Sequence, residues 1–132
     1  MTKLKSRLIA LKLVLDTLGI PFDPHPRDSR MIIHKAVYLA QEKAVDLGYH
    51  FGWYLKGVYC PELAKDICEI DEKIETYCIA ASKNQFYKRH RDRLNELTPL
   101  LTPPDIIDMP QVDWLYEVTT KIYNKNKEGE KE

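Results

Sequence analysis

The sequence predicts a mainly α fold: a compact single helical domain of about five helices, with a short extended or β segment between the second and third helices. Three observations carry this prediction. The 132 residues suffice for one ordinary domain and are too few for two. Apolar residues recur at helical spacing along most of the chain, and one stretch alternates instead. We place the domain at residues 1–123 and expect a flexible charged tail at residues 124–132.

The first two helices are predicted to pack as an antiparallel pair. Residues 3–18 carry leucines three and four positions apart and are followed by a glycine, as in an amphipathic helix with a glycine stop. Prolines alternate with other residues over 20–27, which predicts an extended loop. A cap at Asp28 or Ser29 starts the second helix, and Gly48 closes it.

Residues 49–56 change the period. Large apolar side chains occupy alternate positions, as in a half-buried strand; these are Tyr49, Phe51, Trp53 and Leu55. We expect this strand to pair with the 20–27 loop or to lie against the helices, with Phe51 and Trp53 in the core.

Three further helices follow. The third begins at Pro61, a residue suited to the first helical position, and its apolar spacing continues to Cys78. A break is predicted at 80–84, then a fourth helix at 85–98. The last helix is predicted at 111–123.

Composition excludes several classes of protein. Hydrophobic residues make up 44% and charged residues 30%, which is ordinary globular usage. Twenty basic residues balance twenty acidic ones, which argues against a dedicated nucleic-acid or membrane-surface protein. Three cysteines without a CxxC pair, and no signal-like start, favour reduced thiols in the cytoplasm.

The middle of the chain resembles a known family. The residues concerned are Lys35 and Tyr38-Leu39 on a helix, then Leu47-Gly48-Tyr49-His50-Phe51, Trp53-Tyr54, Lys56-Gly57-Val58-Tyr59-Cys60-Pro61-Glu62-Leu63 and Asp66-Ile67. This order resembles the Panacea domain, the SocA-like, antitoxin-associated family, of which the chain would be a divergent member. Its members tend to show a Gln-Lys-Leu and Tyr-Leu helix, a Gly-Tyr-x-Phe segment and a Gly-Pro-Tyr-Ser turn. The chain departs from that pattern at His34, Val58 and Cys60, where the family has Gln, Pro and Ser.

The resemblance implies a cytosolic protein-binding domain from a bacterium, an archaeon or a phage. Members are thought to neutralise a toxin by binding it, and one group delivers the bound toxin to a protease. We therefore expect a cognate protein partner, a toxin and a protease among the candidates, and no cofactor. Self-association stays open.

The predicted partner-binding residues surround the turn after the extended segment. Tyr and Trp offer large contact areas with a polar handle, so Tyr54 and Tyr59 are the favoured contacts. The full set is Lys35, Trp53, Tyr54, Gly57, Tyr59, Pro61 and Glu62. Two of these have a plainer explanation, since Gly57 suits a turn of positive φ and Lys35 can snorkel along a helix flank. Lys35 could instead reach a carbonyl or carboxylate near the 57–62 turn.

A nucleic-acid-binding helical module is the alternative function. Residues 83–93 hold five basic residues against one acidic residue, and residues 61–76 hold six acidic against two basic. The plainer explanation is that the two helices pack close together with complementary exposed edges. The candidate nucleic-acid contacts are Lys88, Arg89, Arg91 and Arg93.

Catalysis is not expected. The best enzymatic arrangement is a cysteine-dependent site at Cys60, at a helix N-terminus, with His34 and His50 near it in sequence. A buried, small hydrophobic cysteine is the competing explanation. The spacing of the cysteines and His90 fits no common zinc pattern, and no glycine-rich phosphate-binding loop is present.

Overall fold

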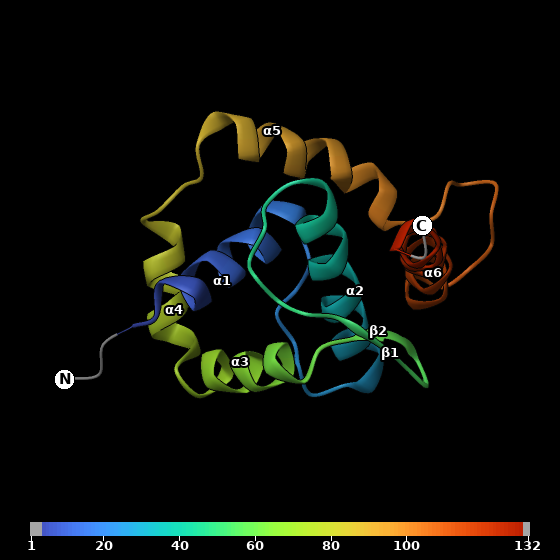
Figure 1. The fold of residues 1–132 in the computed structure, drawn as a ribbon. Coiled ribbons are helices and arrows are strands. Elements are labelled where there is room, and N and C mark those ends of the chain that lie inside the picture. Colours follow the sequence, from blue (N-terminus) through green and yellow to red (C-terminus); the bar gives the residue numbers. More distant parts are fainter. Residues whose placement is uncertain (1–3, 131–132) are drawn as a thin grey trace.

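The computed structural model describes residues 4–130, with side chains through residue 127. It confirms the mainly helical fold and the short β segment between the second and third helices, and it has six α-helices over the described range (Figure 1). In chain order, the elements are α1 (Ser6–Leu18), α2 (Arg27–Lys43), β1 (Gly52–Tyr54), β2 (Gly57–Tyr59), α3 (Pro61–Glu72), α4 (Ile74–Ser82), α5 (Lys88–Leu97), the 3₁₀ helix η1 (Thr98–Leu101) and α6 (Gln111–Glu130).

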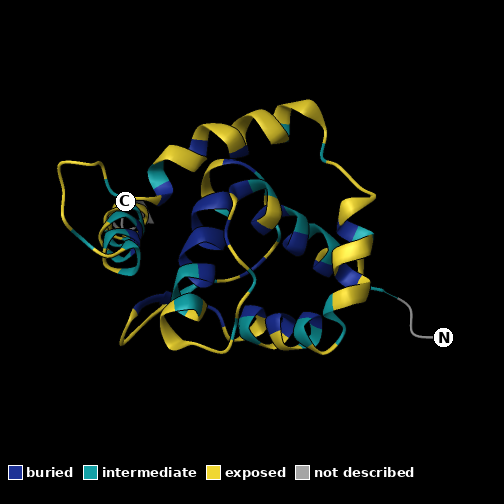
Figure 2. Cartoon of the chain, turned by 180° about the vertical axis from the view of Figure 1, so that it is seen from behind, coloured by how far each residue is buried: buried dark blue, intermediate teal, exposed yellow. Residues whose placement is uncertain are grey.

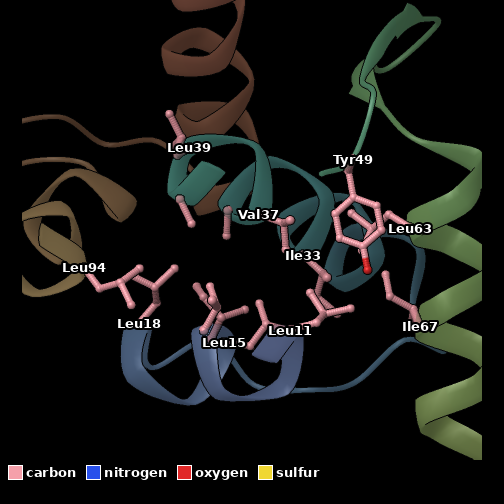
Figure 3. Packing of buried hydrophobic residues seen from close by; sticks show 14 of the residues in the cluster. Leu11, Leu15, Leu18, Ile33, Val37, Leu39, Tyr49, Leu63, Ile67 and Leu94 are labelled. Carbon is pink, nitrogen blue, oxygen red and sulfur yellow. The ribbon is translucent and has the colours of Figure 1, made fainter. Parts of the chain in front are cut away.

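The core lies between α1 and its neighbours. The predicted leucine stripe of α1 is buried and faces α2, with α5 and α3 closing the two sides (Figure 3). Leu15 of α1 and Val37 of α2 are fully buried, and Leu94 of α5 is too. Gly19 ends α1 in the left-handed region, φ 73°, as a glycine stop requires. Because each of these helices has one apolar stripe, packing the stripes against one another buries them and accounts for the fold.

Helix α2 ends earlier than predicted, at Lys43 rather than near Gly48. The amides of Ala44 and Val45 both donate to the Ala40 carbonyl, and the chain then leaves the helix. It turns back along α2, because the Gln41 side chain binds both backbone groups of Tyr49. Its Nε2 donates to the Tyr49 carbonyl at 2.6 Å, and its Oε1 accepts from the Tyr49 amide at 3.0 Å.

The predicted strand is shorter than expected and has a different partner. β1 pairs antiparallel with β2, with Trp53 opposite Val58, rather than with the 20–27 loop. Burial declines along the alternating residues: Tyr49 is 3% exposed, Trp53 43% and Leu55 99%. The expectation that Trp53 belongs to the core was therefore wrong. The tip of the hairpin projects from the helices (Figure 1), whereas Val58 of β2 is 1% exposed.

The predicted third helix is two helices. The backbone breaks at Lys73, with φ −128° and ψ 39°, between α3 and α4. Ile70 of α3 and Tyr77 of α4 are both in the core, on either side of this break. Tyr77 Oη accepts a hydrogen bond from the Lys5 amide at 3.4 Å, so α4 is fixed against the start of α1.

The last helix is longer than predicted. α6 continues past Tyr123 to Glu130, through most of the predicted tail. Asn126 provides one reason, since its Nδ2 donates to Tyr38 Oη at 3.4 Å and to Glu42 Oε2 at 3.1 Å. Residues 131–132 lie outside the described range. Over that range, no helix has both the length and the apolar character needed to cross a bilayer.

Candidate functional site: the hairpin face

Most of the predicted contact residues meet at the β1–β2 hairpin. Leu55 and Lys56 form its tip, and Gly57 follows with φ 97°. A side chain at Gly57 would strain this backbone and would lie 3.1 Å from the Tyr116 ring. Gly57 therefore shapes the turn and lets it pack against α6, in agreement with its predicted backbone role.

Lys35 holds the tip from beneath. Its side chain is 1% exposed, and its Nζ donates to the Lys56 carbonyl at 2.7 Å. Nζ also lies 5.9 Å from the centre of the Tyr116 ring. Burial lowers the pKa of Lys35 to about 8. The snorkelling explanation is wrong, since the ammonium group is buried and bonded to a carbonyl of the turn.

His34, the residue before Lys35 on α2, packs against Tyr59 of β2. The two rings stack with centroids 4.4 Å apart and planes inclined by 17°. His34 Nδ1 accepts a hydrogen bond from the Cys60 amide at 3.4 Å. Burial, with smaller contributions from the charges of Lys35 and Arg30, lowers the pKa of His34 to about 4. His34 is therefore a neutral spacer between α2 and the hairpin at neutral pH.

Cys60 is the N-cap of α3. Its Sγ accepts a hydrogen bond from the Leu63 amide at 3.4 Å, and the residue is 1% exposed. The contact with His34 is made by the Cys60 backbone, and His50 is exposed on the loop before β1. A thiolate nucleophile needs an accessible sulfur, so this geometry offers little to the cysteine-enzyme alternative.

The outer surface of the hairpin is apolar and exposed. Tyr54 is 49% and Tyr59 37% exposed, and their rings meet edge to face at 5.1 Å. Leu55, which follows Tyr54 at the turn between the strands, is 99% exposed. Figure 2 shows the tip of the hairpin in the colour of exposed residues. We name the surface of Tyr54, Leu55, Lys56 and Tyr59, with the pocket below it, the hairpin face.

A pocket of about 430 Å³ lies between the hairpin, α2 and α3. It brings together Lys35, Tyr54 and Tyr59 from the predicted set. The lining also includes Arg27 and Met31, which sequence reasoning missed. The signal was present, since the lining positions of α2 are 27, 30, 31, 34 and 35, one face at helical spacing.

The other predicted contacts lie outside the pocket lining. Trp53 packs towards α6, 5.4 Å from the Tyr123 ring between centroids. Pro61 occupies the first position of α3, exposed to solvent. Glu62 pairs with Arg7 of α1 at 2.8 Å, and the same guanidinium binds the buried Asp66 at 2.9 Å. Glu62 therefore serves the α1–α3 contact.

The acidic helix does not pack against the basic helix. Glu69 of α3 pairs with Lys5, the residue before α1, at 2.9 Å, and Asp71 of α3 lies 3.3 Å from His25 in the loop before α2. α1 lies between α3 and α5 (Figure 1). The predicted pairing of complementary helix edges was therefore wrong.

The basic residues of α5 do not share one face. Lys88 pairs with Asp92 at 2.9 Å. At about 100° per residue, Arg89 and Arg93 lie about 40° apart around the helix, whereas Arg91 lies about 160° from both. One duplex or one strand could not meet all of them along a single line, which weakens the nucleic-acid alternative.

Comparisons with known proteins find no matching family model, no matching curated protein and no matching solved structure. The resemblance to the Panacea domain therefore stays a prediction. Among the described residues, no three histidine, cysteine or carboxylate side chains are grouped so that they could hold a metal ion. The hairpin face is the arrangement from which a function can be argued.

Proposed function

We propose that this chain is a protein-binding domain and that its partner contacts the hairpin face. The observation that carries the proposal is the tip itself, where the 99% exposed Leu55 lies beside the half-exposed rings of Tyr54 and Tyr59. An exposed apolar cluster of this kind, next to a pocket with a mainly apolar lining, is typical of an interaction site. Tyrosine is also a frequent interface anchor.

The way the hairpin is held favours binding as well. Lys35 bonds the tip to α2, and His34 stacks beneath Tyr59. Gly57 packs the other side of the turn on Tyr116. A surface fixed before the partner arrives loses less conformational entropy on binding.

The resemblance to the Panacea domain supports a more specific proposal. By that resemblance, the partner is a toxin that the domain neutralises in the cytoplasm, or a toxin that it delivers to a protease. Nucleic-acid binding through α5 is the competing function, and an anisotropy titration with duplex and single-stranded DNA at physiological salt separates the two. We expect no binding in that titration.

The test uses the partner that copurifies with the tagged protein from the cells that make it. After identification of that partner, its affinity is measured by calorimetry for the unmodified protein, Leu55→Asp and Tyr59→Ala. Leu55 makes no recorded hydrogen bond or ring contact among the described residues, so Leu55→Asp should keep the melting temperature while reducing affinity about fivefold or more, as for an interface anchor.

Ile106→Asp is the matched control, because Ile106 is 94% exposed and lies on a different surface loop. It should bind like the unmodified protein. Equal affinities for Leu55→Asp, Tyr59→Ala and the unmodified protein would refute the proposed surface.

A further inference from the structure

The pocket below the hairpin tip is lined by apolar side chains and by basic ones. Met31 of α2, Val58 of β2 and Ile67 of α3 provide apolar side chains. The volume of about 430 Å³ lies within the range of small ligand sites and accommodates a large side chain together with a polar group. A ligand that fits this pocket should therefore carry a large apolar side chain.

The charged residues of the pocket indicate which polar group the ligand should carry. Arg27, Arg30, Lys35 and Lys56 line the pocket, and no carboxylate does. Lys35 is bonded to a backbone carbonyl, and Arg30 Nη1 donates to two carbonyls of the preceding loop. For the side chains of Arg27 and Lys56, the structure records no acidic partner among the described side chains.

This charge imbalance is local. The whole chain has twenty basic and twenty acidic residues, so a pocket whose charged residues are all basic does not follow from composition. The adjacent pocket, of about 460 Å³, shares Arg27 and Lys56 but adds Asp28 and Asp113. Its charges are mixed, whereas the charged side chains that line the pocket under Tyr54 and Tyr59 are all basic.

We infer that the pocket binds a segment of the partner protein in which an aspartate or glutamate stands next to a large apolar side chain. This inference rests on the proposed function and names the chemistry of the partner at that site. The apolar side chain lies over Met31 and Ile67, against the paired rings of Tyr54 and Tyr59, and the carboxylate pairs with the exposed Arg27 and Lys56. Charge-assisted hydrogen bonds of this kind are stronger than neutral ones and fix orientation.

The experiment is a selection of short random peptides, displayed on phage, against three proteins. These are the unmodified chain, the double variant Arg27→Glu with Lys56→Glu, and a control with Arg89→Glu and Arg93→Glu. Each double variant changes the net charge equally, and the control changes it on α5. Glutamate at the first turn of α2 is favourable for the helix, so the Arg27 variant should fold; circular dichroism and the melting temperature check this.

The unmodified protein and the control should enrich peptides with Asp or Glu beside Leu, Phe or Trp, and the pocket variant should not. A fluorescein-labelled peptide of the most enriched sequence should lose about tenfold or more in affinity when its acidic residue becomes Asn or Gln. It should lose a similar factor with the pocket variant.

Three outcomes would overturn the inference. In the first, neutral or basic peptides are enriched and Leu55→Asp abolishes their enrichment. This result would contradict the acidic segment while leaving the proposed function in place. Enrichment of no peptide at all would also overturn the inference. Tighter binding of a labelled single-stranded oligonucleotide than of the acidic peptide, lost in the same pocket variant, would assign the cationic lining to a polyanion instead.

Discussion

Replacement of His34 by Gln should remove an acid-sensitive contribution to stability. His34 is 3% exposed, and its surroundings lower its pKa from 6.5 to about 4. Between these two values the unfolded chain takes up a proton on this residue and the folded chain does not, so the free energy of unfolding falls as the pH falls. Above about pH 6.5 the contribution is fully present, and below about pH 4 it is lost.

The size follows from the two pKa values. At about 1.4 kcal/mol per pH unit, the interval from 6.5 to about 4 corresponds to about 3.5 kcal/mol, of which about 3 kcal/mol is lost by pH 4. Glutamine offers a carbonyl oxygen to the Cys60 amide that His34 Nδ1 now serves, and it does not titrate. Carboxylates contribute to acid denaturation in both proteins, so the difference between the proteins isolates His34.

The assay is urea denaturation followed by circular dichroism at several pH values from 7 to 4. The unmodified protein should lose about 3 kcal/mol more than His34→Gln over this range. The exposed His50 provides the control, and His50→Gln should behave like the unmodified protein. Parallel curves for the unmodified protein and His34→Gln, or an NMR titration of His34 near pH 6.5, would refute the reasoning.

Three further changes test the framework around the hairpin face. Gly57→Ala should destabilise the chain by about 2 kcal/mol in chemical denaturation, and by more than Gly48→Ala, because both have positive φ but only Gly57 would place its new side chain against a ring. Tyr49→Phe should cost about 2 kcal/mol, since the lost hydroxyl donates to the buried carboxylate of Asp66 at 2.7 Å; an unchanged urea midpoint would contradict this. Cys60→Ser should raise the stability by about 0.5 kcal/mol, as oxygen is a better cap acceptor than sulfur, and a lower melting temperature would count against that role.

The helices could be predicted where burial follows a simple period. α1 is the clearest case, because its leucines at helical spacing all face one core and Gly19 ends it in a left-handed conformation. The period could not reveal the break at Lys73, since apolar residues continue across it. Nor could it reveal that α6 extends beyond Tyr123, because that extension is supported by Asn126, a polar residue whose contacts lie on α2.

The candidate site was predictable only in part. Tyr54 and Tyr59 could be chosen from residue type, and the structure leaves both partly exposed. For Lys35 the sequence leaves two explanations open, and the structure bears out the bond to a carbonyl beside the 57–62 turn. That carbonyl is 21 positions later in the chain, so spacing along one helix cannot choose between the two explanations. Glu62 belongs to the turn that the sequence predicts to contact a partner, whereas in the structure it pairs with Arg7 of α1. The roles of such charged side chains depend on contacts with residues distant in the sequence, which local patterns do not reveal.

Site-specific photocrosslinking in the cells that make the protein shows directly whether a partner protein binds the hairpin face. A benzophenone amino acid replaces Leu55 in one variant and the equally prominent Ile106 in another. We expect one discrete protein adduct from position 55, absent from position 106 and lost when Tyr59→Ala is added. An adduct of the same partner from position 106 alone, or from position 55 with full yield in the Tyr59→Ala background, would contradict binding through the hairpin face.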